Sequence, residues 1–79
     1  MRVLVIDDEP SVARALRRML SGHDVTLWGE GDDAVGLITS GAYDAVLCDL
    51  MIPDKSGIEI YDRVQRDDPA QLRRIVFMT

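Results

Sequence analysis

Cysteine is almost absent from this sequence, because Cys48 is the one cysteine among 79 residues. A disulfide within the chain is therefore excluded. Cys48 lies inside an apolar segment, so we expect a small buried core residue rather than a reactive thiol. Long apolar runs are missing as well, since no segment reaches the roughly 20 apolar residues that a transmembrane helix needs.

Basic residues are few and scattered. Nine lysines and arginines stand against 14 aspartates and glutamates, and the formal net charge is −5. The longest basic runs are the doublets Arg17-Arg18 and Arg73-Arg74. Because nucleic-acid affinity depends on lysine and arginine side chains that meet phosphates, we do not expect this segment to bind nucleic acid by itself.

A secretory signal is missing from the N-terminus. The apolar stretch after Arg2 is only four residues long and ends in Asp7-Asp8-Glu9. A signal peptide needs a longer apolar region and no such acidic run. We therefore expect a cytoplasmic protein that makes no contact with a membrane.

The chain is expected to form a single domain. Hydrophobic residues make up 47% of it, which is enough for a core and unlike a disordered composition. The length is short for an α/β domain, which usually has roughly 100–150 residues. The sequence contains no linker and no low-complexity segment.

Four short segments have the apolar composition of strands that are buried on both faces of a sheet. They are Arg2–Ile6, Val25–Trp28, Tyr43–Cys48 and Arg74–Thr79. A stretch of helical character lies between each strand and the next, which gives the order β-α-β-α-β-α-β. This order predicts an α/β fold with a parallel sheet and helices on both faces.

Three segments between the strands have the spacing of amphipathic helices. Pro10 suits the first position of the first helix. The second helix follows a cap at Asp32 or Asp33 and ends at Gly41, and the third begins near Gly57. The residues expected on the buried faces are Val12, Leu16, Met19 and Leu20, then Ala34, Val35, Leu37 and Ile38, then Ile60, Tyr61 and Val64.

Carboxylates follow two of the predicted strands directly. Asp7 and Asp8 come after the first strand, and Asp49 comes after the third. If these strands are parallel neighbours, all three carboxylates meet at the carboxyl edge of the sheet, where α/β proteins bind ligands. One pair about 4 Å apart would cost roughly 4 kcal/mol at an effective dielectric constant near 20. The cluster therefore calls for a divalent cation, and Mg²⁺ suits oxygen ligands.

At this point the sequence resembles a known family, the receiver domain of bacterial two-component response regulators. The resemblance is carried by residues 3–10, 47–57 and 77–79, each in the predicted element, and residues 31–35 resemble the start of the family's second helix. It implies a flavodoxin-like sheet with strand order 2-1-3-4-5. It also implies a signalling domain rather than an enzyme, although such domains assist their own phosphotransfer and dephosphorylation.

The resemblance also implies roles for individual residues. Asp49 would accept a phosphoryl group from a sensor histidine kinase or a phosphotransfer protein. Asp8 and Asp49 would bind Mg²⁺ directly, Asp7 would bind it mainly through water, and the backbone carbonyl of Met51 would be a further ligand. Thr79 would hydrogen-bond the phosphoryl group and move towards it on activation.

The sequence departs from the family pattern at its C-terminal end. Members of the family continue through another helix, a fifth strand and a last helix, and the fifth strand carries a lysine that pairs with the phosphoryl group. Lys55 does not match that lysine, because it lies in the loop after the third strand. We therefore expect residues 1–79 to form a C-terminally incomplete receiver domain. Its fourth strand would be an open sheet edge through which homo-oligomers could form.

Three other functions are compatible with parts of the pattern. A receiver-like interaction or dimerisation module that no longer accepts phosphate would explain the missing lysine. A phosphatase of the haloacid dehalogenase type also uses an aspartate at a strand end, but it needs a second aspartate where Met51 stands here. A nucleotide-binding domain is disfavoured because Gly29-Glu30-Gly31 is an incomplete glycine motif.

Overall fold

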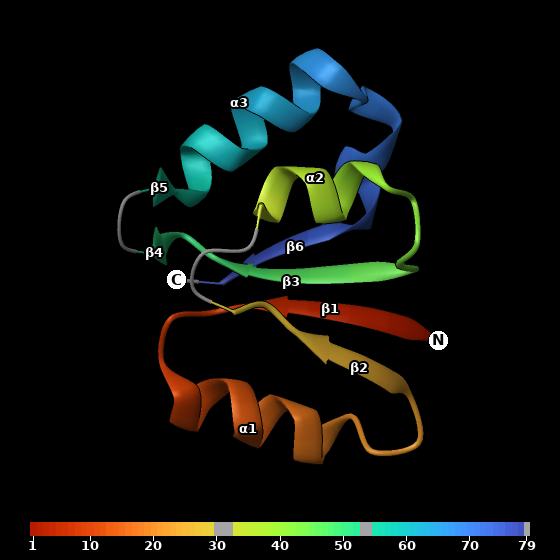
Figure 1. Ribbon diagram of the computed structural model, residues 1–79, viewed down its shortest axis with the longest axis vertical. Helices are drawn as coiled ribbons and strands as arrows, with labels where there is room; N and C mark the ends of the chain where they lie inside the picture. The colour runs from red at the N-terminus through yellow and green to blue at the C-terminus, as the bar shows by residue number, and fades with distance from the viewer. Residues whose placement is uncertain (30–32, 53–54, 79) are drawn as a thin grey trace.

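A parallel sheet of four strands forms the centre of the protein. The computed structural model describes residues 1–29, 33–52 and 55–78. The strands are β1 (Arg2–Ile6), β2 (Asp24–Leu27), β3 (Ala45–Asp49) and β6 (Ile75–Met78), and their order in the sheet is β2-β1-β3-β6 (Figure 1). The predicted α/β fold with a flavodoxin-like order 2-1-3-4 is therefore confirmed. β1 has the predicted bounds, whereas β2, β3 and the start of β6 differ from the predicted ranges by one or two residues.

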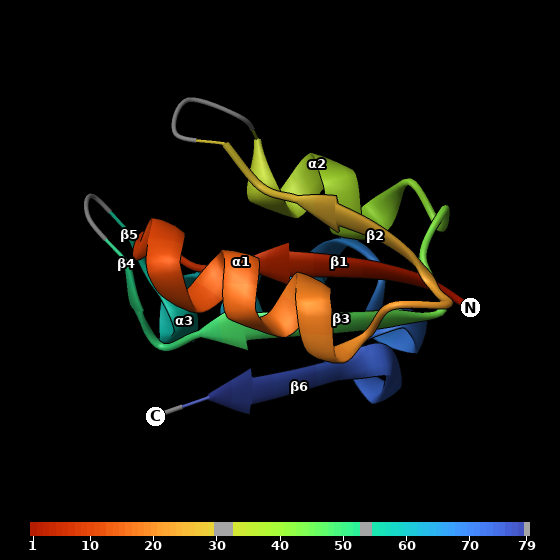
Figure 2. The same cartoon turned by 90° about the horizontal axis from the view of Figure 1, so that it is seen from below.

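Helices cover both faces of this sheet. One face carries α1 (Pro10–Met19), and the other carries α2 (Ala34–Thr39) and α3 (Gly57–Asp67), as Figures 1 and 2 show. A 3₁₀ helix, η1 (Pro69–Arg74), leads into β6 and was not predicted, so Arg74 belongs to η1 rather than to the strand. The predicted loop after β3 contains a short antiparallel pair, β4 (Met51–Ile52) and β5 (Lys55–Ser56).

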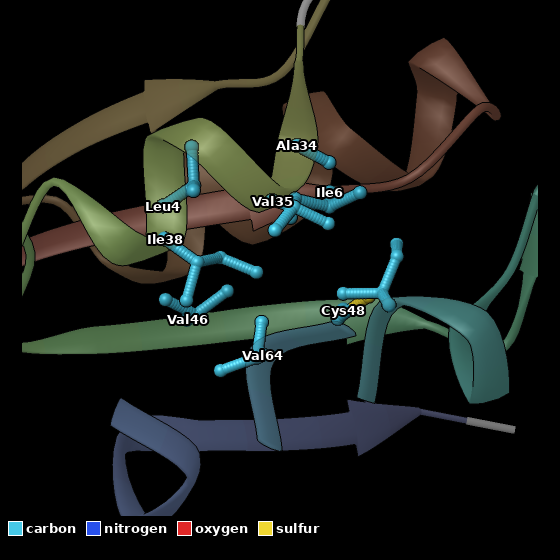
Figure 3. Packing of buried hydrophobic residues seen from close by; sticks show 9 residues of the cluster. Leu4, Ile6, Ala34, Val35, Ile38, Val46, Cys48 and Val64 are labelled. Atoms are coloured by element: carbon cyan, nitrogen blue, oxygen red, sulfur yellow. The ribbon is translucent and has the colours of Figure 1, made fainter. Parts of the chain in front are cut away.

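The main hydrophobic core lies between the sheet and the helices α2 and α3. Leu4 and Ile6 of β1 and Val46 and Cys48 of β3 point to this side and are almost completely buried (Figure 3). A second, smaller core forms on the other face, where Val3 and Val5 pack with Ala13 of α1. Because both faces of β1 are covered, this strand needs the uninterrupted apolar run that its sequence shows.

The residues of α1 that are buried against the sheet differ from the predicted ones. Ala13 is the buried residue of this helix, and Leu16 and Leu20 pack beside it. Val12 is 41% exposed and Met19 is 77% exposed, so the prediction that both are buried was wrong. The face that packs against the sheet is thus formed by Ala13, Leu16 and Leu20, and at about 100° per residue Val12 and Met19 lie to one side of it.

The buried face of α3 is also narrower than predicted. Ile60 and Val64 are fully buried, as expected. Tyr61 is 41% exposed, because it lies one position further around the helix from Ile60. Its ring still contacts Phe77 of β6, with the two ring centroids 6.0 Å apart. Tyr61 therefore lies at the margin of the core rather than inside it.

The ends of α2 agree in part with the prediction. Asp33 occupies the N-cap position, but its side chain makes no capping hydrogen bond there. Asp32, the other predicted cap, lies outside the described residues. Gly41 follows the helix with φ of 73°, a left-handed conformation that favours glycine and ends a helix. No helix in the described part of the chain is long and apolar enough to cross a membrane.

Candidate metal centre

Three carboxylates meet at the carboxyl edge of the sheet. Ile6 and Cys48 are register partners in the parallel pair of β1 and β3, so the residues that follow them are neighbours. Asp7 and Asp8 continue the chain after β1, and Asp49 is the last residue of β3. One carboxylate oxygen from each of the three lies within 4.8 Å of the others. The predicted convergence of these residues is therefore confirmed.

The three carboxylates differ in their surroundings. Asp7 is only 9% exposed, Asp49 is half-buried and Asp8 is exposed. The Oδ1 atom of Asp7 accepts a hydrogen bond of 2.8 Å from the backbone amide of Glu9, which holds the Asp7 side chain in place at the start of α1. Asp8 is the carboxylate that a cation can approach from solvent most directly.

The hydrogen bond between Asp7 and Glu9 was not part of the sequence prediction. Its signal is an aspartate two residues ahead of its backbone partner, the pattern of an Asx turn. Pro10 at the first helical position fixes the backbone that follows. This local turn keeps Asp7 at the sheet edge even though the chain reverses direction immediately afterwards.

Cys48 lies directly before Asp49, and its side chain is buried in the main hydrophobic core beneath the carboxylates. Burial, together with the negative charges of Asp49 and Asp7, raises the pKa of its thiol to about 12. Since the thiolate is the reactive form of cysteine, the thiol stays protonated and inert near neutral pH. The expectation of a buried core cysteine is confirmed by an exposed fraction of 0%.

The donor set of the cluster fits a hard divalent cation. Three carboxylates so close together repel one another, and a bound cation would offset this repulsion. Carboxylate oxygens are ligands of Mg²⁺ and Ca²⁺, whereas softer metals favour imidazole or thiolate. The one cysteine nearby is protonated, so the oxygens are the ligands that the site offers.

Gly57 permits the close packing of the segment that follows Asp49. Its backbone amide donates a hydrogen bond of 2.8 Å to the carbonyl of Leu50. A Cβ atom at position 57 would lie 2.8 Å from the Cα atom of Leu50 and 3.2 Å from the carbonyl oxygen of Asp49. A residue larger than glycine at position 57 would therefore meet the backbone of Leu50 and Asp49.

We expect Gly57→Ala to lower the free energy of unfolding by about 1–3 kcal/mol, the usual cost of overpacking. The loss should be visible as a lower midpoint in urea denaturation. Because the clash involves the backbone of Leu50, the additional change Leu50→Ala should not restore stability. Recovery in that double variant, or a change below about 0.5 kcal/mol in Gly57→Ala, would contradict the steric explanation.

The structure does not test the predicted roles of Met51 and Thr79, but it places Lys55 as expected. The backbone of Met51 belongs to β4 and pairs with Ser56, and the role of its carbonyl oxygen stays a prediction. The backbone of Lys55 lies in β5, after β3, as the sequence predicted. Thr79 lies outside the described residues, so the structure does not test the predicted contact of Thr79 with a phosphoryl group.

Comparison with known families and proteins identifies relatives of this chain. The family model described as the response regulator receiver domain matches residues 3–79. The transcriptional regulatory protein DltR of Streptococcus agalactiae is 43% identical over 67 residues, which cover 82% of this chain and 30% of DltR. TcrA of Mycobacterium tuberculosis is 40% identical over 68 residues, which cover 84% of this chain and 27% of TcrA. The chain thus spans less than a third of these relatives.

Solved structures of similar fold include receiver domains. The N-terminal domain of a response regulator receiver protein from Methanoculleus marisnigri has a TM-score of 0.80 at 26% identity, covering 99% of this chain and 65% of that one. TrrA of Thermotoga maritima, in complex with Mg²⁺ and BeF, has a TM-score of 0.75 at 28% identity, with coverages of 96% and 64%. A complex of TrrA with the histidine kinase ThkA matches with a TM-score of 0.79 at 30% identity, with coverages of 99% and 67%.

These matches also bear on the alternative protein families that the sequence analysis considered. The receiver family model matches residues 3–79, which favours this family over the haloacid dehalogenase type and over a nucleotide-binding domain. The strand order β2-β1-β3-β6 agrees with the receiver structures.

Proposed function

The chain belongs to the response regulator receiver domain family, and on this premise we propose that it accepts a phosphoryl group on Asp49 in a two-component phosphorelay. The donor would be a sensor histidine kinase or a phosphotransfer protein, and Mg²⁺ would be the cofactor. One observation carries the proposal: the carboxylates of Asp7, Asp8 and Asp49 lie within 4.8 Å of one another at the carboxyl edge of the sheet.

The three carboxylates suit different positions around Mg²⁺. Asp8 is exposed and Asp49 is half-buried, so both can offer an oxygen directly to a cation. Asp7 has one oxygen engaged with the Glu9 amide, and we propose that it acts mainly through bound water. The backbone carbonyl of Met51 is the further proposed ligand. Bound Mg²⁺ would supply charge neutralisation between the acceptor carboxylate and the incoming phosphoryl group.

Asp49 is the proposed nucleophile. In the proposed step, a carboxylate oxygen of Asp49 forms a bond to phosphorus while the bond from phosphorus to the histidine nitrogen of the donor breaks. Phosphoryl transfer of this kind depends mainly on positioning and charge neutralisation. Asp49 is fixed in the middle of the sheet, because β3 pairs with β1 on one side and with β6 on the other.

The proposed switch residue Thr79 follows Met78, and Met78 is the register partner of Asp49. A hydroxyl group at this place would give the new phosphoryl oxygens a hydrogen-bond donor. The phosphoryl group adds roughly −1.5 to −2 charge, and such a change can bias a surface with two arrangements. The domain is proposed to signal in this way rather than to turn over a substrate as an enzyme.

Two of the similar structures support Mg²⁺ as the cofactor and a histidine kinase as the partner. One is TrrA with Mg²⁺ and BeF, and another is TrrA with the histidine kinase ThkA. By analogy we propose Mg²⁺ and a histidine kinase for this chain. Which kinase it meets, and its expected cytoplasmic location, stay predictions.

Labelling with acetyl phosphate tests the proposal. We expect the protein to take up one acid-labile phosphate in the presence of Mg²⁺ and to lose this uptake when EDTA removes the metal. Mass spectrometry at neutral pH, followed by brief acid or hydroxylamine treatment, would measure it. A protein that binds Mg²⁺ and yet remains unlabelled would instead favour the interaction module that no longer accepts phosphate.

A further inference from the structure

One glycine packs against the backbone that carries Asp49. Gly57 is the first residue of α3, and it is buried. In the antiparallel pair of β4 and β5, Met51 stands opposite Ser56. The same register places Gly57 opposite Leu50, the residue that follows Asp49. The β4–β5 pair thus returns the chain to the carboxyl end of β3, where α3 begins (Figure 1).

Both backbone polar groups of Leu50 are engaged in hydrogen bonds. Its carbonyl accepts a hydrogen bond of 2.8 Å from the Gly57 amide, and its amide donates one of 3.1 Å to the carbonyl of Met78. Met78 is also the register partner of Asp49. The backbone of Asp49 and Leu50 is therefore fixed between the start of α3 on one side and β6 on the other.

Position 57 has no room for a side chain. A Cβ atom there would lie 2.8 Å from the Cα atom of Leu50, whereas ordinary van der Waals contact begins at 3.4 Å. It would also lie 3.2 Å from the carbonyl oxygen of Asp49. Because both neighbours are backbone atoms, no change of side-chain rotamer can relieve these two contacts. A larger residue therefore forces the backbone to move by several tenths of an ångström.

The helix α3 cannot supply all of this movement. Ile60 and Val64 of α3 are fully buried in the main core. Moving the helix outward would open space around both side chains, and cavities in a core are destabilising. The backbone of Asp49 and Leu50 therefore takes up part of the displacement. Such a shift moves the Asp49 carboxylate relative to the other two carboxylates of the cluster, which follow β1.

A displaced carboxylate affects small and large cations differently. Mg²⁺ requires nearly ideal octahedral geometry, with oxygen ligands at about 2.0–2.1 Å. Ca²⁺ accepts a flexible arrangement of oxygens at about 2.3–2.6 Å. A shift of Asp49 by several tenths of an ångström is therefore more harmful to the binding of Mg²⁺ than to the binding of Ca²⁺.

We propose that Gly57 is a positioning residue for the metal site. It lets α3 pack directly against the backbone of Asp49 and Leu50, and this contact holds the Asp49 carboxylate in the compact arrangement that Mg²⁺ requires. Gly57 thereby contributes to the preference of the site for Mg²⁺ over Ca²⁺. The inference rests on the proposed Mg²⁺ site but not on phosphoryl transfer. Metal titration without a phosphate donor can therefore overturn it while labelling of Asp49 is unaffected, and the reverse also holds.

Isothermal titration calorimetry of wild type and Gly57→Ala with Mg²⁺ and with Ca²⁺ tests the proposal. We expect the dissociation constant for Mg²⁺ to rise about tenfold in the variant, the lower end of the effect of groups that orient metal ligands. The dissociation constant for Ca²⁺ should change by no more than about threefold, because its geometry is flexible. Partial unfolding would weaken the binding of both cations equally. An unchanged ratio of the two affinities would therefore overturn the proposal.

Gly22→Ala is the matched control for lost stability. Gly22 has φ of 100°, and a Cβ atom there would meet nothing within 4 Å. This variant therefore loses stability through backbone strain alone. Gly22 precedes β2, at the opposite end of the sheet from the carboxylates, so the ratio of the two affinities should stay within about twofold of wild type. A change in this ratio as large as that in Gly57→Ala would overturn the proposal.

Hydrogen exchange in the wild-type protein provides a test that does not depend on the folding of a variant. Coupling between two sites is reciprocal, so bound Mg²⁺ must favour the packing at Gly57 if that packing favours Mg²⁺. Saturating Mg²⁺ should slow exchange of the Gly57 amide at least about fivefold more than exchange of the Asp44 amide. The Asp44 amide is the control, because it bonds to the Arg2 carbonyl at the amino end of the sheet. Equal slowing of the two amides would overturn the proposal.

Discussion

Replacing Asp49 with asparagine should abolish the uptake of acid-labile phosphate. Asparagine has nearly the shape of aspartate, but its amide is not a nucleophile that can form an acyl phosphate. The fold should remain, because Asp49 is the last residue of β3 and its backbone pairing is unchanged. Without Mg²⁺, this variant should be at least as stable as the wild type, because one of three repelling charges is removed.

A matched control for this experiment is Asp62→Asn. Asp62 lies on the exposed face of α3, away from the carboxylate cluster, and its substitution should leave labelling unchanged. Intact-mass measurements give the phosphate content, and circular dichroism shows that both variants are folded. If the Asp49→Asn protein still carried acid-labile phosphate, another residue would be the acceptor.

The second large effect concerns metal affinity. Asp8→Ala should weaken Mg²⁺ binding by at least about 10–100-fold. Loss of a group that only hydrogen-bonds a metal ligand already has an effect of this size, and a direct ligand contributes at least as much. Asp8 is exposed, so its removal leaves the buried core and the β1–β3 register unchanged. Isothermal titration calorimetry, or the rise in melting temperature as Mg²⁺ is added, would measure the loss.

Glu9→Ala provides the control for Asp8→Ala. Glu9 is the next acidic residue along the chain, and its backbone amide, not its side chain, holds Asp7. Substitution of this side chain changes the net charge by the same amount but leaves the three carboxylates in place. Mg²⁺ affinity that fell equally in both variants would indicate a general effect of charge rather than ligation by Asp8.

The strands and the carboxylate site were predictable because their signals are local or follow from topology. Buried parallel strands need continuous apolar runs, and residues 2–6 form such a run. Once β1 and β3 are parallel neighbours, the residues at their carboxyl ends must meet at one edge. The juxtaposition of Asp7, Asp8 and Asp49 follows from those two steps, and the structure shows it.

The orientation of the helices was harder to predict, because it depends on how closely each helix can approach the sheet. The apolar residues of α1 allow more than one face to be buried, and in the structure the buried face contains Ala13 and leaves Met19 exposed. The short elements β4, β5 and η1 also escaped prediction. These elements have only two, two and six residues, too few for a periodic apolar pattern.

The sequence by itself determined the order of strands and helices, the acidic ends of two strands and the lack of any cysteine pair. Those properties depend on residue type and on neighbours along the chain. Only the tertiary structure decided that three carboxylates come within 4.8 Å, that the pKa of Cys48 rises to about 12, and that Val76 lies exposed on β6. Distance, burial and exposure depend on segments far apart in sequence, and packing alone brings these together.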